Sequence, residues 1–137
     1  MMTAGYSGSP LVKKLGIKDG FAVSTINAPD DYRELLAPIP NGVLISDSLA
    51  ADADLIHIFT NSRDELFGKL SECVRLIKQD GSVWVSWYKK TAKLETEITE
   101  DTVREAAFPL GLVDVKVCAV DATWSGLKLV IRVSERG

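Results

Sequence analysis

The sequence contains few of the residues from which metal sites, disulfide frameworks and membrane spans are built. Its 137 residues include one histidine, His57, and two widely separated cysteines, Cys73 and Cys118, which cannot supply the closely spaced ligands of a zinc site. No apolar run approaches the roughly 18 residues of a membrane-spanning helix, and residues 1–10 lack the apolar core of a signal peptide. We therefore expect a cytoplasmic protein with no metal, no membrane association and no structural disulfide.

Positive charge and nucleophilic motifs are also scarce. The formal net charge of -3 at pH 7 gives the chain no general attraction for the phosphate groups of nucleic acid. Ser7 and Ser125 lie near glycines, but neither stands in the Gly-x-Ser-x-Gly elbow that exposes a catalytic serine. These absences argue against nucleic acid and nucleophilic serine catalysis. They leave a protein, a small anionic ligand or a second copy of the chain as the expected partner.

The residues that are present alternate between strand and helix signals, which is typical of an α/β fold. At 46% hydrophobic and 26% charged residues, the chain is typical of one domain that buries about two-thirds of its unfolded surface. We expect a single domain over residues 1–137, in which residues 1–20 form an N-terminal helix and a lead-in to the first strand. The pattern predicts strands at residues 21–26, 43–46, 54–60 and 83–87, and helices at residues 31–36, 62–77 and 99–109.

Two groups of strands differ in their polarity. Residues 54–60 are apolar on both faces, as in a parallel strand that helices cover on both sides. Residues 113–117 and 127–131 alternate apolar and polar side chains, which predicts an antiparallel hairpin whose first strand has its three valines on one face. A turn is expected at Asp80 and Gly81. The predicted fold is a three-layer Rossmann-like sandwich with a mostly parallel sheet that ends in an antiparallel C-terminal hairpin.

Several segments resemble class I methyltransferases. LGIKDG at residues 15–20 is similar to the entry to their first strand, DLI at residues 54–56 to their fourth strand, and DGSV at residues 80–83 to the entry to their fifth. The closing hairpin resembles their last two strands, whereas one strand and one helix are missing between Ser46 and Asp54. The resemblance implies a truncated and degenerate methyltransferase-like fold.

The chain as a whole is also similar to an uncharacterised bacterial family of domain-of-unknown-function proteins. The segments GSVWVSWYKK at residues 81–90 and GLVDVKVCAVDATWSGLKLVIR at residues 111–132 carry this resemblance. Membership in such a family implies no known activity, so the resemblance supports only the fold.

The methyltransferase resemblance implies that a methyl donor would bind at the turn after the first strand, where an acidic residue precedes glycines. Here Thr25 takes the acidic position, and Asn27 and Pro29 replace the glycines. Proline removes an N–H group and fixes φ, which a turn that cradles a ligand cannot easily accept. Asp30 and Asp31 are expected to cap the next helix, where a ligand carboxylate would otherwise bind. We therefore predict no cofactor at this turn.

Three further features each have a functional and a structural interpretation. Asp47 has the spacing of an acid that binds ribose hydroxyls, but a solvated loop residue is the simpler explanation. His57 could act as a general base, although its apolar neighbours in mid-strand favour a core histidine. Residues 5–9 could form an anion-binding nest, although a flexible terminus that leads into a capped helix explains them as simply.

Side chains that follow different parallel strands are expected to converge at one edge of the sheet. The predicted ligand or partner surface at this edge comprises Asn27, Asn61, Arg63, Trp87, Tyr88, Lys89, Lys90 and Trp124. Aromatic side chains beside lysines suit a small planar anion or a protein surface. The structural alternative is that the lysines lie in a solvated loop and the tryptophans fill the core or cap the sheet edge.

Two functions remain open. The favoured one is a non-catalytic binding or regulatory module, or a homo-oligomer subunit, on a degenerate methyltransferase-like scaffold. It depends on the missing glycines and on the lack of an acid–base or metal constellation. The alternative is a small-molecule enzyme that acts on an anionic metabolite near Asn27, Arg63 and the two lysines at residues 89–90.

Overall fold

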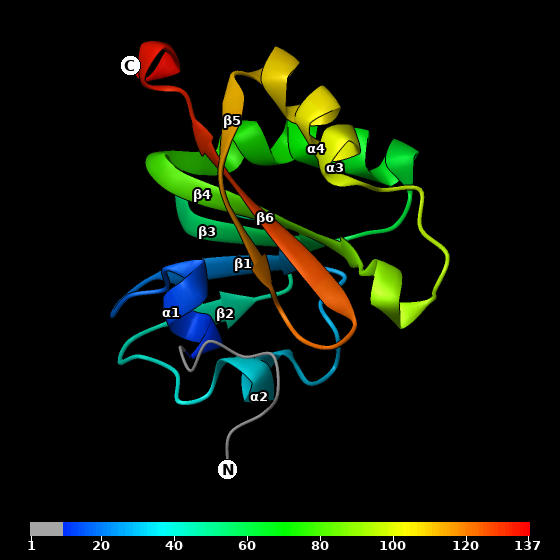
Figure 1. Cartoon of the computed structure of the whole chain (residues 1–137). Coiled ribbons are helices and arrows are strands. Elements are labelled where there is room, and N and C mark those ends of the chain that lie inside the picture. Colours follow the sequence, from blue (N-terminus) through cyan, green and yellow to red (C-terminus); the bar gives the residue numbers. More distant parts are fainter. Residues whose placement is uncertain (1–9) are drawn as a thin grey trace.

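A mixed sheet with the strand order β2-β1-β3-β4-β6-β5 runs through the computed structural model, which describes residues 10–137 (Figure 1). The strands are β1 (Ala22–Ile26), β2 (Leu44–Ser46), β3 (Ala53–Phe59), β4 (Ile77–Tyr88), β5 (Leu112–Ala119) and β6 (Trp124–Ile131). The helices are α1 (Leu11–Leu15), α2 (Tyr32–Leu36), α3 (Arg63–Leu76), α4 (Glu100–Ala107) and the 3-10 helices η1 (Lys90–Ala92), η2 (Phe108–Leu110) and η3 (Val133–Glu135). Neighbouring strands from β2 to β4 are parallel, whereas β6 pairs antiparallel with both β4 and β5.

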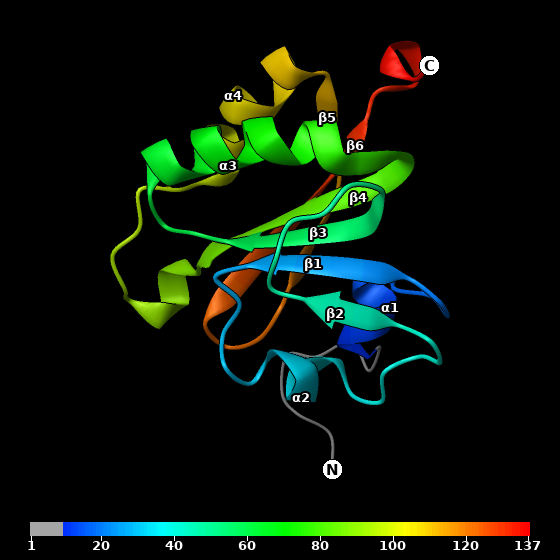
Figure 2. The same ribbon diagram turned by 180° about the vertical axis from the view of Figure 1, so that it is seen from behind.

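Helices cover both faces of the sheet, as the view from behind also shows (Figure 2). On one face, α3 and α4 cover a core in which Leu66 is fully buried. On the other face, α1 and α2 contribute Leu15 and Leu36 to a second core. Trp87 belongs to the first core and Trp84 to the second, because side chains alternate along a strand. The predicted three-layer Rossmann-like sandwich is confirmed.

The boundary between α3 and β4 differs from the prediction. α3 begins after Ser62, whose side chain caps the helix by accepting a hydrogen bond from the N–H of Glu65, but Ile77, the last residue of the predicted helix, already belongs to β4. β4 continues through residues 80–81, so no turn separates two elements there, but the register against β3 shifts from Ala53 opposite Ile77 to Leu55 opposite Ser82. The expected turn is thus a bulge inside the strand. A Cβ at Gly81 would lie 2.9 Å from the backbone oxygen of Asp54. The glycine is therefore needed for the close approach of two strands, which is a recognised role of glycine inside a strand.

The valines of β5 do not share one face. The register between β5 and β6 shifts between Asp114 and Lys116, which makes Val115 an extra residue in a β-bulge. Beyond the bulge, Val117 lies opposite the buried Leu127, on the face that α4 covers in part. Val115 is 55% exposed and Val117 is 53% exposed. The predicted alternation is wrong here, because one inserted residue reverses the facing of every side chain that follows it.

Two smaller predictions concern the connections. Residues 47–52 join β2 to β3 without a helix or strand, which confirms the missing strand and helix. α1 ends at Gly16, whose φ of 82° is a left-handed conformation that favours glycine. Ser9, the expected cap of the N-terminal helix because it precedes Pro10, lies outside the described residues.

Candidate functional site

The direction in which the chain crosses the sheet reverses between β1 and β3, because β2 lies on one side of this pair and β4 on the other. In open α/β sheets, ligands bind in the crevice outside the carboxyl ends of the strands at such a switch point. Asn27 follows β1 there, and Thr60 follows β3. This is also the turn at which the methyltransferase resemblance implies a methyl donor.

Asn27 spans this switch point. Its backbone φ of 59° is left-handed, a conformation that asparagine tolerates better than most residues and that glycine adopts freely. Its side-chain Nδ2 donates a hydrogen bond of 3.2 Å to the backbone oxygen of Phe59, the last residue of β3. The turn thus keeps a glycine-like backbone at Asn27, but an amide side chain joins the ends of the two strands.

The next residues of the turn differ in part from the prediction. Pro29 has no N–H group, and its carbonyl oxygen accepts a hydrogen bond from the N–H of Tyr32. Asp31 occupies the N-cap position of α2, but neither it nor Asp30 caps the helix with its side chain, so this prediction is wrong. The reason is the backbone of Asp31, because its φ of -92° and ψ of 17° depart from the extended conformation of a capping residue.

The acidic positions of the resemblance are also changed. Thr25 is buried, and its Oγ1 donates a hydrogen bond of 3.4 Å to the backbone oxygen of Ser46. Asp47 is exposed in the connection after β2, which agrees with its interpretation as a solvated loop residue. Compared with the methyltransferase turn, this turn therefore lacks the glycines and one N–H donor, and no carboxylate lies at the end of β1. These residues do not fit a methyl donor.

His57 is a core residue and not a general base. It is fully buried in β3, where Nδ1 forms a hydrogen bond of 2.9 Å with the hydroxyl of Tyr32 and Nε2 one of 2.8 Å with Oγ of Ser86. Burial lowers the pKa of His57 from 6.5 to about 3, and it raises the pKa of Tyr32. The imidazole is therefore neutral near pH 7 and has hydrogen-bond partners at both nitrogens.

An open groove lies beside the carboxyl end of β4, one strand beyond the switch point. Its volume is about 1130 Å³. Its lining includes five residues of the predicted surface, which are Asn61, Trp87, Tyr88, Lys89 and Lys90. The rest of the lining comes from the loop after η1, the first turns of α4, and β6. The convergence predicted at this edge of the sheet is thus found at β4.

Trp87 and Ser125 contribute to the groove from the sheet. The two residues lie opposite each other in the antiparallel pair of β4 and β6, so their side chains share one face. Trp87 is only 7% exposed and packs in the core under α3 and α4. Trp87 therefore belongs both to the core and to the lining of the groove, so the functional and the structural interpretation of this residue each hold in part.

Asn61 holds the wall of the groove in place. Its side-chain Oδ1 accepts a hydrogen bond of 2.9 Å from the N–H of Tyr88, and its backbone oxygen accepts one of 2.9 Å from the N–H of Glu97. The side chain of Glu97 in turn accepts a hydrogen bond of 2.8 Å from the N–H of Arg63, and Ile98 is buried in the core. The loop is thus fixed to the strands and to the start of α3.

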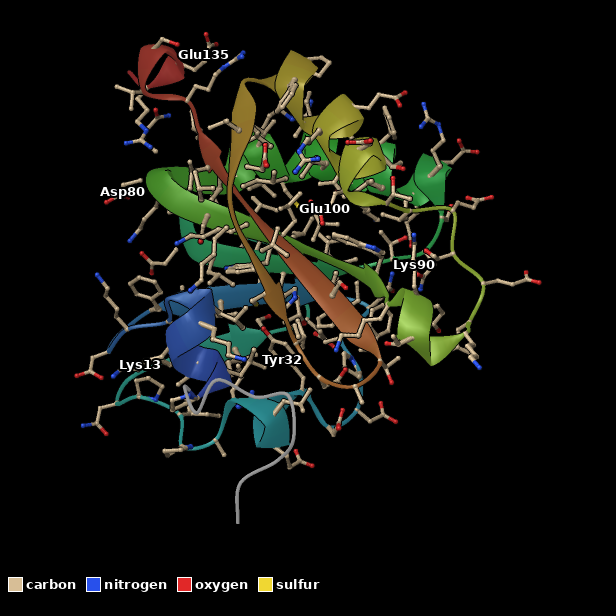
Figure 3. The ribbon with its side chains drawn as sticks, viewed as in Figure 1. Lys13, Tyr32, Asp80, Lys90, Glu100 and Glu135 are labelled. Carbon is tan, nitrogen blue, oxygen red and sulfur yellow. The ribbon has the colours of Figure 1, made fainter. Side chains whose placement is uncertain are left out.

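Charges of both signs line the groove. Lys89 and Lys90 lie where β4 meets η1, and their side chains form no ion pair among the described residues. Glu100 and Asp101 lie in the first turn of α4, and each forms an ion pair of 3.0 Å with Arg104. Figure 3 shows Lys90 and Glu100 on these two separate elements.

The sequence interpretation missed the acidic side of the groove. Its carboxylates are those of Glu95, Glu97, Glu100 and Asp101. The last two fall at the start of the helix predicted at residues 99–109, and the first two lie outside the predicted elements. A run of carboxylates at residues 95–101, soon after three lysines at residues 89–93, is the signal that could have found them.

Three residues of the predicted surface do not line the groove. Asn27 lies at the switch point, as described above. Arg63 is exposed on α3, where its guanidinium pairs with Glu105 of α4 and lies 4.5 Å from the centre of the Phe67 ring. Trp124 packs against Tyr88 and Phe59, which places it with the second core.

The remaining predictions concern metals, membranes, cysteines and the N-terminal residues. Within residues 10–137, no group of three or more histidine, cysteine or acidic residues could hold a metal ion. No helix in the same range is long and apolar enough to cross a membrane. Cys73 and Cys118 are both free thiols. Residues 5–9, considered as an anion-binding nest, lie outside the described part of the chain.

Solved structures share this fold at low sequence identity. A protein assigned to the type 11 methyltransferases, from Sulfolobus solfataricus, is 19% identical with a TM-score of 0.65 over 93% of this chain and 92% of that one. A SAM-dependent methyltransferase from Aquifex aeolicus is 16% identical with a TM-score of 0.60 over 88% and 87%. A protein assigned to the methyltransferases from Haloferax volcanii, in complex with a methyltransferase activator, is 13% identical with a TM-score of 0.60 over 88% and 86%. These similarities confirm the methyltransferase-like fold, and at such identities they show the fold alone.

The sequence comparisons give the family. No curated protein matches the chain. The model of the family described as "Protein of unknown function (DUF3052)" matches residues 12–133, which is most of the sequence. The chain therefore belongs to this family of proteins of unknown function, as its resemblance predicted.

Proposed function

We propose that this protein is a non-catalytic binding module that holds its ligand in the groove beside β4 and not at the switch point. The observation that carries the proposal is the hydrogen bond from Nδ2 of Asn27 to the backbone oxygen of Phe59. It joins two strand ends at the point where a cofactor would enter the crevice of this fold. Pro29 removes a further N–H donor from the same turn.

The groove has the features of a preformed binding site. Trp87 supplies aromatic surface, and Asn61 fixes the wall through the hydrogen bonds that it accepts from the N–H groups of Tyr88 and Glu97. A wall that is already ordered lowers the entropy cost of binding. The only histidine, His57, does not line the groove, so it offers no imidazole for general acid–base catalysis there.

Calorimetric titration with S-adenosylmethionine and S-adenosylhomocysteine tests the first half of the proposal. We expect no saturable heat from either compound. Thermal unfolding is an independent readout, because a ligand at 100 times its Kd stabilises the folded state by about 2.7 kcal/mol. Saturable binding that an Asn27→Lys substitution removes would contradict the proposal, since it would place the cofactor at the switch point.

A second candidate is a small-molecule enzyme that acts on an anionic metabolite in the same groove. The specific observation in its favour is that Lys89 and Lys90 form no ion pair among the described residues and lie beside Trp87. Their ammonium groups are therefore available to a phosphate or carboxylate. The carboxylates on the opposite side of the groove disfavour a ligand that carries negative charge throughout.

A thermal-shift screen with dinucleotides and phosphorylated metabolites separates the two candidates. If a metabolite binds in the groove, a Lys89→Ala/Lys90→Ala variant should lose the shift. Lys13→Ala is the matched control, because Lys13 is an exposed lysine of α1 on the other face of the sheet. Silence across the screen would remove the enzyme candidate in this form. A hit that the double variant retains would remove the two lysines from the site.

A further inference from the structure

The charges of the groove are divided between two elements. Lys89 and Lys90 gather where β4 meets η1, while Glu100 and Asp101 lie where α4 begins. Glu95, on the loop between these elements, adds a carboxylate that forms no ion pair among the described residues. Arg104 also lines the groove and pairs with Glu100 and Asp101, so two carboxylates face one guanidinium on the α4 side. The η1 side is therefore basic and the α4 side keeps a net negative charge; Figure 3 labels Lys90 and Glu100 on these two elements.

We propose that the ligand of the groove is an extended polypeptide segment of a partner protein, with an acidic side chain at the η1 side and a basic side chain at the α4 side. This inference rests on the proposed function, because it assigns a class of ligand to the same groove. Charge complementarity of this kind sets the orientation of a bound chain and rejects segments that run the wrong way.

The start of α4 is a poor binding site for an anion. The hydroxyl of Thr99 accepts a hydrogen bond from the N–H of Thr102, and the hydroxyl of Thr102 accepts one from the N–H of Thr99. This capping box satisfies N–H groups that could otherwise bind a ligand carboxylate or phosphate. Glu100 and Asp101 add negative charge at the same place, which Arg104 offsets only in part through its ion pairs with both. A basic side chain suits this side of the groove, and an anion does not.

The groove also has apolar lining residues, against which a side chain of the segment would pack. Leu94 in the loop is 51% exposed and belongs to the lining. Trp87 and Ile98 lie in the same lining and belong to the core. An apolar residue between the two charged ones would bury the exposed surface of Leu94.

The size and the charge of the groove favour a polypeptide over other ligands. The volume of about 1130 Å³ lies above the roughly 300–1,000 Å³ of small-molecule pockets. The four carboxylates would repel the phosphates of a nucleic acid, which carry one sign of charge along their whole length. A peptide supplies both signs of charge and an apolar residue within a few positions.

Selection of random peptides on the full chain tests the inference. A phage-displayed library of peptides about a dozen residues long is selected on the immobilised protein, and the enriched peptides are synthesised and titrated by fluorescence anisotropy. We expect them to share an acidic and a basic residue at a constant spacing. The Lys89→Glu/Lys90→Glu variant should weaken binding by at least about tenfold, in line with the loss of a charge pair of about 1.4 kcal/mol.

Exchange of charges makes the test specific to the groove. Peptides whose acidic residue is changed to lysine should recover affinity for the Lys89→Glu/Lys90→Glu variant, and peptides whose basic residue is changed to glutamate should recover it for Asp101→Lys. The side chain of Asp101 is 93% exposed, so this substitution leaves the core untouched. Lys13→Glu and Asp30→Lys are matched controls at exposed positions away from the groove, and neither should alter affinity.

The outcomes distinguish this inference from the proposed function. Peptides whose affinity neither groove variant changes would overturn both, because the groove would not be their site. Peptides that need the groove but carry charge of one sign only would overturn the inference and leave the binding module in place. Failure to enrich any peptide would overturn the inference alone, and the metabolite screen would then decide the proposed function.

Discussion

Two asparagines at the same edge of the sheet have opposite effects. Asn27 follows β1, and its side chain joins the ends of β1 and β3 by a hydrogen bond to the backbone of Phe59. Asn61 follows β3, and its hydrogen bonds with Tyr88 and Glu97 hold the wall of a groove of about 1130 Å³. We infer that strand order selects the edge of the sheet where a ligand can bind, while a few side-chain hydrogen bonds decide which strand end is open.

The largest expected effect is the loss of stability at low pH caused by His57, which lies in the sheet that carries both asparagines. The pKa of His57 is about 3 in the folded protein and 6.5 ordinarily, so the unfolded chain binds a proton at a pH where the folded chain does not. The contribution of the neutral His57 to the free energy of unfolding should be complete above pH 6.5. As the pH drops from there toward 3, this contribution should decrease by about 1.4 kcal/mol per pH unit. Urea unfolding at several pH values measures this slope.

A His57→Asn variant is the control for this prediction. It lacks a titratable ring, so it should be less stable near pH 7 but should lose the part of the pH dependence that His57 causes. If the free energy of unfolding fell equally steeply with decreasing pH in the wild type and in the variant, groups other than His57 would cause the acid unfolding.

Loss of the Asn61 side chain should have the next largest effect. Asn61→Ala leaves the N–H of Tyr88 without its acceptor, which should cost about 1–3 kcal/mol and speed hydrogen exchange at that amide. Asn61→Asp is the matched control, because a carboxylate oxygen can still accept the hydrogen bond. Equal losses in both variants would mean that Asn61 does not act through this bond, and the contrast with Asn27 would fail.

Substitution of Asn27 should cost less. Asn27→Ala places a side chain with a Cβ but no amide at a φ of 59°, and it should destabilise the fold by about 1 kcal/mol. Asn27→Gly keeps the backbone conformation and should cost less than the alanine variant. Neither variant should gain affinity for S-adenosylmethionine, because Pro29 remains in the turn. Thermal unfolding and calorimetry check both statements.

The smallest effect is expected at Arg63. Its side chain is exposed and pairs with Glu105, and exposed ion pairs contribute little to stability. The groove wall depends on the backbone N–H of Arg63, which a substitution retains. Arg63→Ala should therefore change neither the unfolding midpoint nor the affinity of a groove ligand. A clear loss of affinity would return Arg63 to the binding surface and extend the site across α3.

The sequence predicted most elements of the fold, and its errors have local causes. The capping residue Ser62 and the helical spacing of apolar residues located α3, but Ile77 has the same spacing and belongs to β4. At such a junction, an apolar residue that continues the helical spacing cannot be distinguished by sequence from the first residue of a buried strand. The bulge at Val115 depends on pairing with β6, which no residue pattern within β5 announces.

The candidate site was predicted in part. The convergence of Asn61, Trp87, Tyr88 and the two lysines followed from the rule that parallel strands end together. The acidic side was not predicted, because it depends on where the loop after η1 runs and on the position at which α4 begins. The missing glycines indicated that the turn after β1 differs from that of a methyltransferase. However, the hydrogen bond of Asn27 requires the end of β3 as a partner, and sequence alone does not give that distance.

The central claim is that the turn at residues 27–31 does not admit a methyl donor. The most direct test is a titration of ¹⁵N-labelled protein with S-adenosylmethionine, followed by two-dimensional NMR. The backbone amide signals of Asn27, Ala28, Asp30 and Asp31, and the side-chain amide signals of Asn27, should stay in place at millimolar ligand. Saturable shifts confined to these signals would show that the turn binds the methyl donor.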